Sequence, residues 1–216
     1  MRNAFQEELD SIHDTLVKMG KLVEDSMSEA TKALLQPNLE LAEKVIKNDD
    51  VIDDMQHELD ARTMMIIARQ SPVAGDLRTL VTSLRMSADL ERMGDMAHHI
   101  AKLARMRFPN NAVPSELREI VVQMDRVAVS IINKTTHAID TRNTTLAIEL
   151  EKDDDEMDKL HRQLFQVLMD EKWSHSTEVA IDMTLLGRYY ERCADHAVSV
   201  GRRVYYIVNG EYNTAN

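Results

Sequence analysis

The strongest constraint on the fold is an apolar repeat with the period of an α-helix, which runs through almost the whole chain. In its first stretch, apolar residues recur three or four positions apart, at Leu9, Ile12, Leu16, Met19, Val23 and Met27. No stretch shows the alternation with period two that is typical of a half-buried β-strand. The chain is therefore predicted to be all-α.

Turn signals are rare, and they divide the repeat into six long segments. The predicted helices span residues 5–35, 38–69, 76–107, 116–140, 144–171 and 177–208. Helices of about 25 to 32 residues are roughly 40–48 Å long, which suits the rods of an elongated bundle. Hydrophobic residues make up 44% of the chain, enough for a core, which argues against widespread disorder.

The two halves of the chain look like copies of one another. Residues 90–97 and 190–197 share Glu, Arg, Asp and Ala in the same order, between apolar neighbours. Residues 49–55 and 154–160 likewise align their acidic and apolar positions. Two motifs repeated in the same order indicate an internal duplication, and hence two tandem, sequence-related three-helix bundles. The expected domains are residues 1–109 and 115–216.

The duplicated motifs carry paired carboxylates at helical spacing. Glu91 and Asp95 lie one turn apart, nearly opposite the apolar stripe of their helix, and Glu191 and Asp195 repeat this placement. A second pair borders the apolar stripe of the preceding helix in each half, where it can reach the neighbouring helix. These second pairs are Asp49 with Asp53, and Asp154 with Asp158. Up to four carboxylates are therefore expected to share each of two patches.

Two interpretations of these patches stay open. The simpler is a solvated acidic face, neutralised in part by nearby Arg and Lys. Like charges at positions i and i+4 destabilise a helix by a few tenths of a kcal/mol, however, so a pair present in both copies calls for another contribution, such as a bound cation. Carboxylate oxygens favour Mg, Ca, Mn or Fe, and an added imidazole shifts the preference toward Fe, Mn or Zn.

Histidines and arginines near the patches are candidate supporting groups. Arg92 and Arg192 occupy equivalent positions between the paired carboxylates, and His98 is among the best placed imidazoles. Arg78 and Arg85 form a heptad line with Arg92, which favours salt bridges between helices, with a phosphate-like ligand as the alternative. An Asp-x-x-His spacing also recurs, at Asp10/His13, Asp54/His57, Asp95/His98 and Asp158/His161.

Charge and motif content narrow the functional classes. The chain carries 37 Asp and Glu against 26 Lys and Arg, a formal net charge of −11 at pH 7, so no nucleic-acid partner is expected. It has neither a spanning apolar stretch of about 20 residues nor a signal-peptide core, so no membrane insertion and a cytoplasmic location are expected. The one cysteine, Cys193, falls on an apolar stripe and is expected in the core.

No catalytic motif emerges: there is no G-x-S-x-G, no H-E-x-x-H and no Walker sequence, so the chain is not expected to be an enzyme. Two alternatives remain open. One is a carboxylate-bridged metal-binding or di-iron-type protein, suggested by the Asp-x-x-His recurrence. The other is a structural adaptor without metal.

The duplicated motifs resemble those of the PhoU family of phosphate-transport regulators over nearly the whole chain. The motifs are Asp89-Leu90-Glu91-Arg92-Met93-Gly94-Asp95, Tyr190-Glu191-Arg192-Cys193-Ala194-Asp195-His196-Ala197, and Gln70-Ser71-Pro72 with Asp76-Leu77-Arg78. The resemblance implies surface clusters of iron or zinc on Glu/Asp-x-x-x-Asp motifs. The matching positions are Glu91/Asp95 and Glu191/Asp195, with Asp49/Asp53 and Asp154/Asp158 as their partners.

The same resemblance implies a regulatory role that rests on protein contacts. With phosphate plentiful, the family damps the high-affinity phosphate ABC transporter and helps hold the phosphate-sensing histidine kinase in its inactive signalling state. The expected partners are therefore the transporter ATPase subunit, the kinase, and a second copy of the chain in a homodimer.

Overall fold

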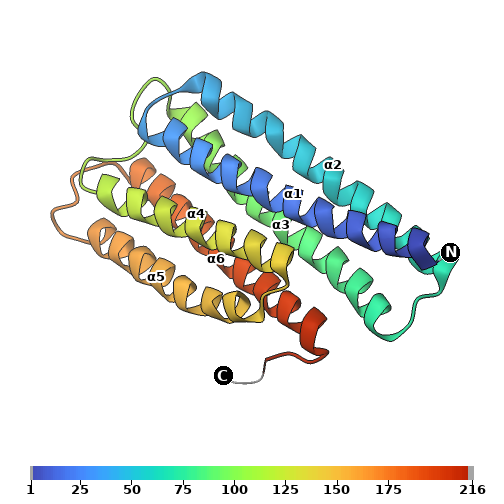
Figure 1. Ribbon diagram of the computed structural model, residues 1–216. Coiled ribbons are helices and arrows are strands. Elements are labelled where there is room, and N and C mark those ends of the chain that lie inside the picture. Colours follow the sequence, from blue (N-terminus) through green and yellow to red (C-terminus); the bar gives the residue numbers. More distant parts are fainter. Residues whose placement is uncertain (1, 214–216) are drawn as a thin grey trace.

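The computed structural model describes residues 2–213, which form six helices and, within that range, no strand (Figure 1). The helices are α1 (Arg2–Leu35), α2 (Leu39–Gln70), α3 (Ala74–Arg107), α4 (Arg118–Thr141), α5 (Thr144–Leu168) and α6 (Thr177–Asn209). The all-α prediction is confirmed, and every helix begins and ends within three residues of its predicted position.

Four central helices and two peripheral ones make up an elongated bundle (Figure 1). In the centre, α1 contacts α3 and α4, and α6 likewise contacts α3 and α4. At the periphery, α2 packs against α1 and α3, while α5 packs against α4 and α6. The second half thus repeats the three-helix arrangement of the first, as the duplication predicts.

One hydrophobic core runs through both halves, because each half turns apolar stripes toward the other. In α1, the predicted stripe is buried, and Met19, Val23 and Met27 are fully enclosed. In α6, Tyr190 is also fully enclosed, and its hydroxyl lies 2.6 Å from the Thr31 Oγ1 of α1. This hydrogen bond joins the two halves inside the core.

Cys193 is fully buried, as predicted. Burial raises the pKa of its thiol to about 12. The side chain therefore stays protonated at neutral pH and acts as a small apolar residue in the core.

Glycine allows a close approach of α5 and α6. A Cβ at Gly201 would lie 2.8 Å from Leu150 Cδ1 and 2.9 Å from the carbonyl oxygen of Ala147. Glycine within a helix costs about 1 kcal/mol relative to alanine. Here that cost accompanies tight contact between the two helices that carry the second set of predicted carboxylates.

The peripheral helices begin in the same way in both halves. The Asn38 side chain caps α2 by accepting a hydrogen bond from the Leu41 N–H at 3.0 Å. Asn143, which occupies the corresponding position 105 residues later, caps α5 by accepting from the Thr145 and Leu146 N–H groups. These caps each stabilise a helix by about 1 kcal/mol, and they fix where the acidic residues of α2 and α5 lie along the bundle.

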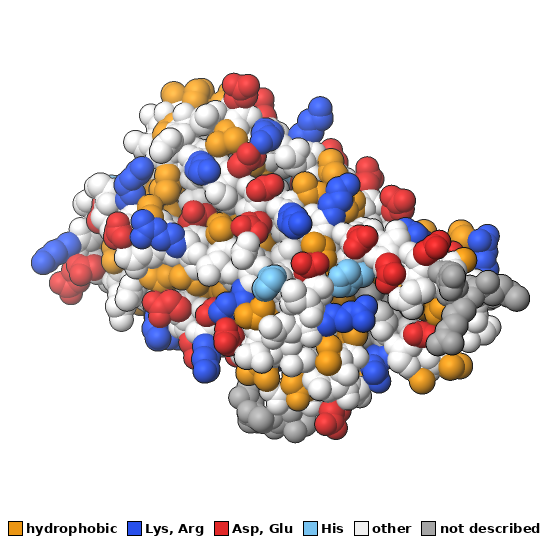
Figure 2. Space-filling model, in the orientation of Figure 1, with side chains coloured by type: hydrophobic (Ala, Val, Ile, Leu, Met, Phe, Trp, Pro, Cys, Tyr) orange, Lys and Arg blue, Asp and Glu red, His pale blue; other side chains and the backbone are white. Residues whose placement is uncertain are grey.

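One face of the bundle carries charges of both signs rather than acidic groups alone (Figure 2). Figure 2 shows acidic and basic side chains interspersed over the face that it displays. None of the described helices is long and apolar enough to cross a membrane.

Candidate functional site

The first carboxylate patch, formed by Asp49, Asp53, Glu91 and Asp95, lies where α2 packs on α3. The pKa of Glu91 is raised, first by burial and then by Asp95, with further contributions from Asp53 and Asp49. The pKa of Asp53 is raised by burial, by Asp49 and by Asp95. The four carboxylates therefore lie within electrostatic reach of one another, as the helical phases predict.

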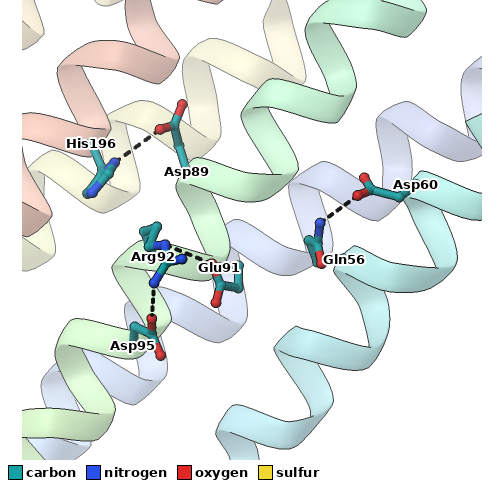
Figure 3. Close-up of polar contacts among 7 residues, drawn as sticks. All are labelled: Gln56, Asp60, Asp89, Glu91, Arg92, Asp95 and His196. Carbon is teal, nitrogen blue, oxygen red and sulfur yellow. Dashed lines mark hydrogen bonds and ion pairs between the residues drawn. The ribbon is translucent and has the colours of Figure 1, made fainter.

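Two of the predicted supporting residues contact this patch. Arg92 Nη1 donates to Asp95 Oδ2 at 2.9 Å, and its Nε lies 3.5 Å from Glu91 Oε2 (Figure 3). His98 Nδ1 contacts Asp49 Oδ2, and the side chain of Asp49 is only 9% exposed. One arginine thus partly neutralises the patch, while His98 links α3 to α2.

The second carboxylate patch, formed by Asp154, Asp158, Glu191 and Asp195, lies where α5 packs on α6. Burial raises the pKa of Asp154 to about 6, with Asp195, Asp158 and Glu191 contributing in that order. The pKa of Glu191 is likewise raised by burial and by Asp195, while Arg188 acts in the opposite direction. The duplication has therefore brought two equivalent sets of four carboxylates together.

The two patches differ in their neutralising groups. Arg192 is exposed and forms no ion pair within residues 2–213, whereas Arg188, one turn earlier, pairs with Glu191. His98 corresponds to Val198 in the second half, so Asp154 has no equivalent imidazole partner, and its Oδ1 is buried without a hydrogen bond. Two arginines therefore pair with carboxylates of the second patch, Arg188 with Glu191 and Arg162 with Asp158 at 3.6 Å, while Asp154 lacks the imidazole that Asp49 has.

The chemistry of the patches fits a hard cation, although their donors do not converge on one point. Buried oxygens of Asp53, Asp154 and Glu191 have no hydrogen-bond partner, and a cation would relieve the mutual repulsion that raises the pKa values. In the described part of the chain, however, no three carboxylate, imidazole or thiol groups are arranged to hold one ion. Side chains would have to rotate to enclose a metal.

The Asp and His side chains of the Asp-x-x-His pairs do not contact each other through hydrogen bonds in the described residues. Across residues 2–213, none of the four pairs is joined by a hydrogen bond; His98 turns to Asp49 rather than to Asp95. The Nε2 of His161 is buried without a partner, and its ring lies against Gly187.

Sequence reasoning missed the ion pairs in the interface between α3 and α6, which we call the seam. Arg107 Nε donates to Asp182 Oδ2 at 2.6 Å, and Arg107 Nη1 donates to Glu178 Oε1 at 2.6 Å. Asp182 is only 5% exposed. A signal was present, because Asp182 lies four residues before Leu186, in phase with the apolar stripe of α6.

A second group of polar contacts lies nearer the middle of the seam. Asp89 of α3 is buried, and its Oδ2 pairs with Arg203 Nη1 of α6 at 2.5 Å. Its Oδ1 lies 3.0 Å from His196 Nδ1 of α6 (Figure 3). The contacts of Asp89 and Arg107 together show that α3 and α6 run antiparallel along the seam and that charged groups tie the two halves together.

Comparison with known proteins places this architecture in a family. The PhoU domain model matches the chain twice, at residues 16–104 and 121–204. The chain belongs to the PhoU family. The resemblance seen in the acidic motifs and the predicted fold of two three-helix repeats are both confirmed.

Relatives in the PhoU family match over almost their full length. The chain is 42% identical to the phosphate-specific transport system accessory protein PhoU homolog 2 of Mycobacterium tuberculosis, covering 98% of this chain and 100% of the relative. It is 31% identical to the corresponding PhoU homolog of Clostridium acetobutylicum, covering 97% and 96%. The crystal structure of the phosphate transport system regulatory protein PhoU from Streptococcus pneumoniae has a TM-score of 0.86 at 25% identity, covering 96% and 98%.

The raised pKa of Asp154 in the second PhoU domain predicts a pH-dependent stability change. In the folded state the pKa of Asp154 is about 6, whereas its ordinary value is 3.8. Ionisation of this carboxylate therefore destabilises the fold as the pH rises from about 4 to about 6. The D154N variant is expected to raise the free energy of unfolding by about 1 kcal/mol at pH 8, a figure reduced for solvent screening. The gain should fade between about pH 6 and pH 4, as measured by urea denaturation.

The exposed neighbour Asp155 provides the matched control. D155N should change stability much less at either pH. An equal gain for D154N at pH 8 and pH 4 would show that the carboxylate charge is not the cause.

Proposed function

We propose that this protein is an accessory protein of a phosphate-specific transport system and a negative regulator of phosphate uptake and phosphate-starvation signalling. The observation that carries the proposal is the match of both PhoU domains to relatives named as accessory or regulatory proteins of phosphate transport. Because the match covers nearly the whole of this chain and of each relative, it concerns both three-helix repeats and not one shared segment.

The protein acts as a non-catalytic adaptor in this proposal. With phosphate plentiful, it contacts the transporter ATPase subunit and the phosphate-sensing histidine kinase and keeps both in their low-activity states. The continuous core and the seam ion pairs support this role, because they join the two halves into one bundle. A cytoplasmic location at the inner face of the membrane and a homodimeric assembly are parts of the proposal.

The two carboxylate patches are the proposed metal sites. Asp49, Asp53, Glu91 and Asp95 would hold iron or zinc in the first, while Mg, Mn and Ca remain open for the same oxygens. The second set would comprise Asp154, Asp158, Glu191 and Asp195. The unpartnered buried oxygens and the raised pKa values support this assignment. A bound cation would supply positive charge that neutralises each patch.

The alternative is a carboxylate-bridged protein of the di-iron type. The facing carboxylates of α2 with α3, and of α5 with α6, favour it. Redox turnover would require a dry interior site, however, and the side chain of Asp158 is 47% exposed. Oxygen consumption together with a stable oxidised di-iron absorption spectrum would support this alternative over the adaptor.

Affinity capture from growing cells tests the proposed function. Tagged protein isolated from phosphate-replete cells is expected to bring down the transporter ATPase subunit or the sensor kinase, and its deletion should raise a phosphate-starvation reporter at high phosphate. Capture with the tag alone is the control. Recovery of neither partner, combined with an unchanged reporter, would contradict the proposal.

A further inference from the structure

A groove between the start of α3 and the end of α6 stands out on this acidic protein. We call it the basic groove; its volume is about 420 Å³. Its lining includes Leu77, Arg78, Val81 and Arg85 of α3, together with Tyr206 of α6 and Tyr212. Two of these residues are arginines and none is acidic, although the chain has a formal net charge of −11. The ends of α3 and α6 that form it lie at the same end of the bundle (Figure 1).

Neither arginine pairs with an acidic side chain among residues 2–213. Arg78 lies over the Tyr206 ring, 5.8 Å from its centroid, and its Nε is buried without a hydrogen bond. Arg85 is exposed and forms no ion pair within the described residues. Asp76, two residues before Arg78, is exposed and pairs with neither arginine, and Asp89, four residues after Arg85, pairs with Arg203 and His196 instead. Within residues 2–213, therefore, no carboxylate neutralises the half-buried Arg78 or the exposed Arg85.

The duplication supplies an internal comparison. Positions 100 residues apart correspond in α3 and α6, so Arg78 and Arg85 match Glu178 and Leu185. The corresponding groove, of about 220 Å³, is lined by His99, Lys102, Leu103, Met106, Asp182, Leu185 and Tyr189. Acidic groups on that side of α6 are held by Arg107 across the seam. Acidic groups in one copy therefore stabilise the seam, while the arginines of the other copy do not.

Exposed apolar side chains lie beside the arginines. Leu77 and Val81 are each 38% exposed and lie one turn apart on α3. Tyr212 is 46% exposed and stacks on Tyr206, with 4.5 Å between the ring centroids. Arg and Tyr are enriched in protein interface hot spots, and the exposed aliphatic side chains beside them add apolar surface that a partner can cover. A helix laid in a groove presents anchors with this same one-turn spacing.

We propose that the basic groove docks an amphipathic helix of a partner protein, whose apolar face covers Leu77 and Val81 and whose carboxylates pair with Arg78 and Arg85. The two arginines are seven residues apart, about 10.5 Å along the helix axis. The partner helix therefore carries Asp or Glu at a spacing of about seven residues. This inference rests on the proposed function only insofar as the partner belongs to the phosphate transport system.

Site-specific photo-crosslinking identifies the occupant of the groove. A benzophenone amino acid replaces Val81 in the full-length protein, in cells grown with plentiful phosphate, and the same group at Val51 of α2, which is 47% exposed, is the control. The expected product is a peptide with two carboxylates about seven residues apart and apolar residues between them, seen at Val81 and absent at Val51. No protein product at Val81, or a product without this pattern, would overturn the proposal.

Charge reversal then measures the contribution of the arginines. The R78E/R85E variant should bind the crosslinked partner at least about tenfold more weakly in calorimetry, because it sets like charges against each other. R105E/R126E is the matched control: both residues are exposed and lie outside the groove, and each double variant moves the formal net charge from −11 to −15. Exchanging the partner's two carboxylates for lysines should restore binding to R78E/R85E.

The outcomes separate this inference from the proposed function. If the partner crosslinked at Val81 binds the wild type and R78E/R85E equally well, the docking inference fails while the proposed function stands. If the groove captures an acidic helix, while neither the transporter ATPase nor the kinase is recovered and the starvation reporter is unchanged, docking stands while the proposed function fails. Inorganic phosphate and ATP are titrated separately, and binding of either one that R78E/R85E abolishes would make the groove a small-anion site and overturn docking.

Discussion

Replacing Arg107 by alanine is expected to lower the free energy of unfolding by about 3 kcal/mol. Arg107 binds both Asp182 and Glu178 across the seam, and its loss leaves the buried Asp182 carboxylate without its cation. An unpaired buried charge costs far more than the net value of an exposed ion pair. Urea denaturation followed by far-ultraviolet circular dichroism measures the change.

Two variants separate the buried charge from a general effect of removing arginine. R202A breaks the exposed pair with Glu151 and should cost less than about 1 kcal/mol. R107A/D182N should recover part of the R107A loss, because it removes the unpaired carboxylate. If R107A costs no more than R202A, the Arg107 pairs do not stabilise the seam.

Substituting Glu91 and Glu191 by Gln together with Asp95 and Asp195 by Asn is expected to reduce bound metal to background. These four residues supply half of the proposed ligands, two in each patch. Helical content should be unchanged, because none of them lies in the core. Elemental analysis after purification without chelator, and again after incubation with Fe²⁺ or Zn²⁺, measures the loss.

A matched variant carries the same four chemical changes at exposed positions away from the patches. It combines E43Q, E171Q, D14N and D140N. This control should keep the metal content of the wild type, because its net charge changes equally while the patches stay intact. Full metal content in the patch variant would show that other residues are the ligands. A wild type without metal above background would instead favour the plain adaptor.

The fold could be predicted because apolar phase alone determines which face of each helix is buried. Met19 and Val23, placed on a stripe by their spacing, are fully enclosed. The carboxylates of each patch could be brought together because the helices that carry them are consecutive in the chain. Duplication then supported the placement, since Glu91 and Glu191 occupy the same phase.

What could not be predicted depends on contacts between distant segments. Asp89 meets Arg203, and Arg107 meets Asp182, across the seam, where no local pattern shows which helix faces which. From the sequence, Arg192 is also expected to support the second patch as Arg92 supports the first, but it forms no ion pair within residues 2–213. Arg188 neutralises Glu191 from the preceding turn, so the duplicated motif has kept its charges but not the pairing between them.

The shared core also bears on how a duplicated chain of this kind arises. Each central helix meets its own copy, α1 against α4 and α3 against α6. Two identical halves related by a two-fold axis would make the same contacts, which is the arrangement of an isologous dimer. A lone half would leave these apolar stripes in water, so a single-repeat precursor would be stable only as a pair. In a fused chain each copy can change alone: Arg78 and Arg85 line one end of the seam, while at the corresponding end Glu178 and Asp182 pair with Arg107.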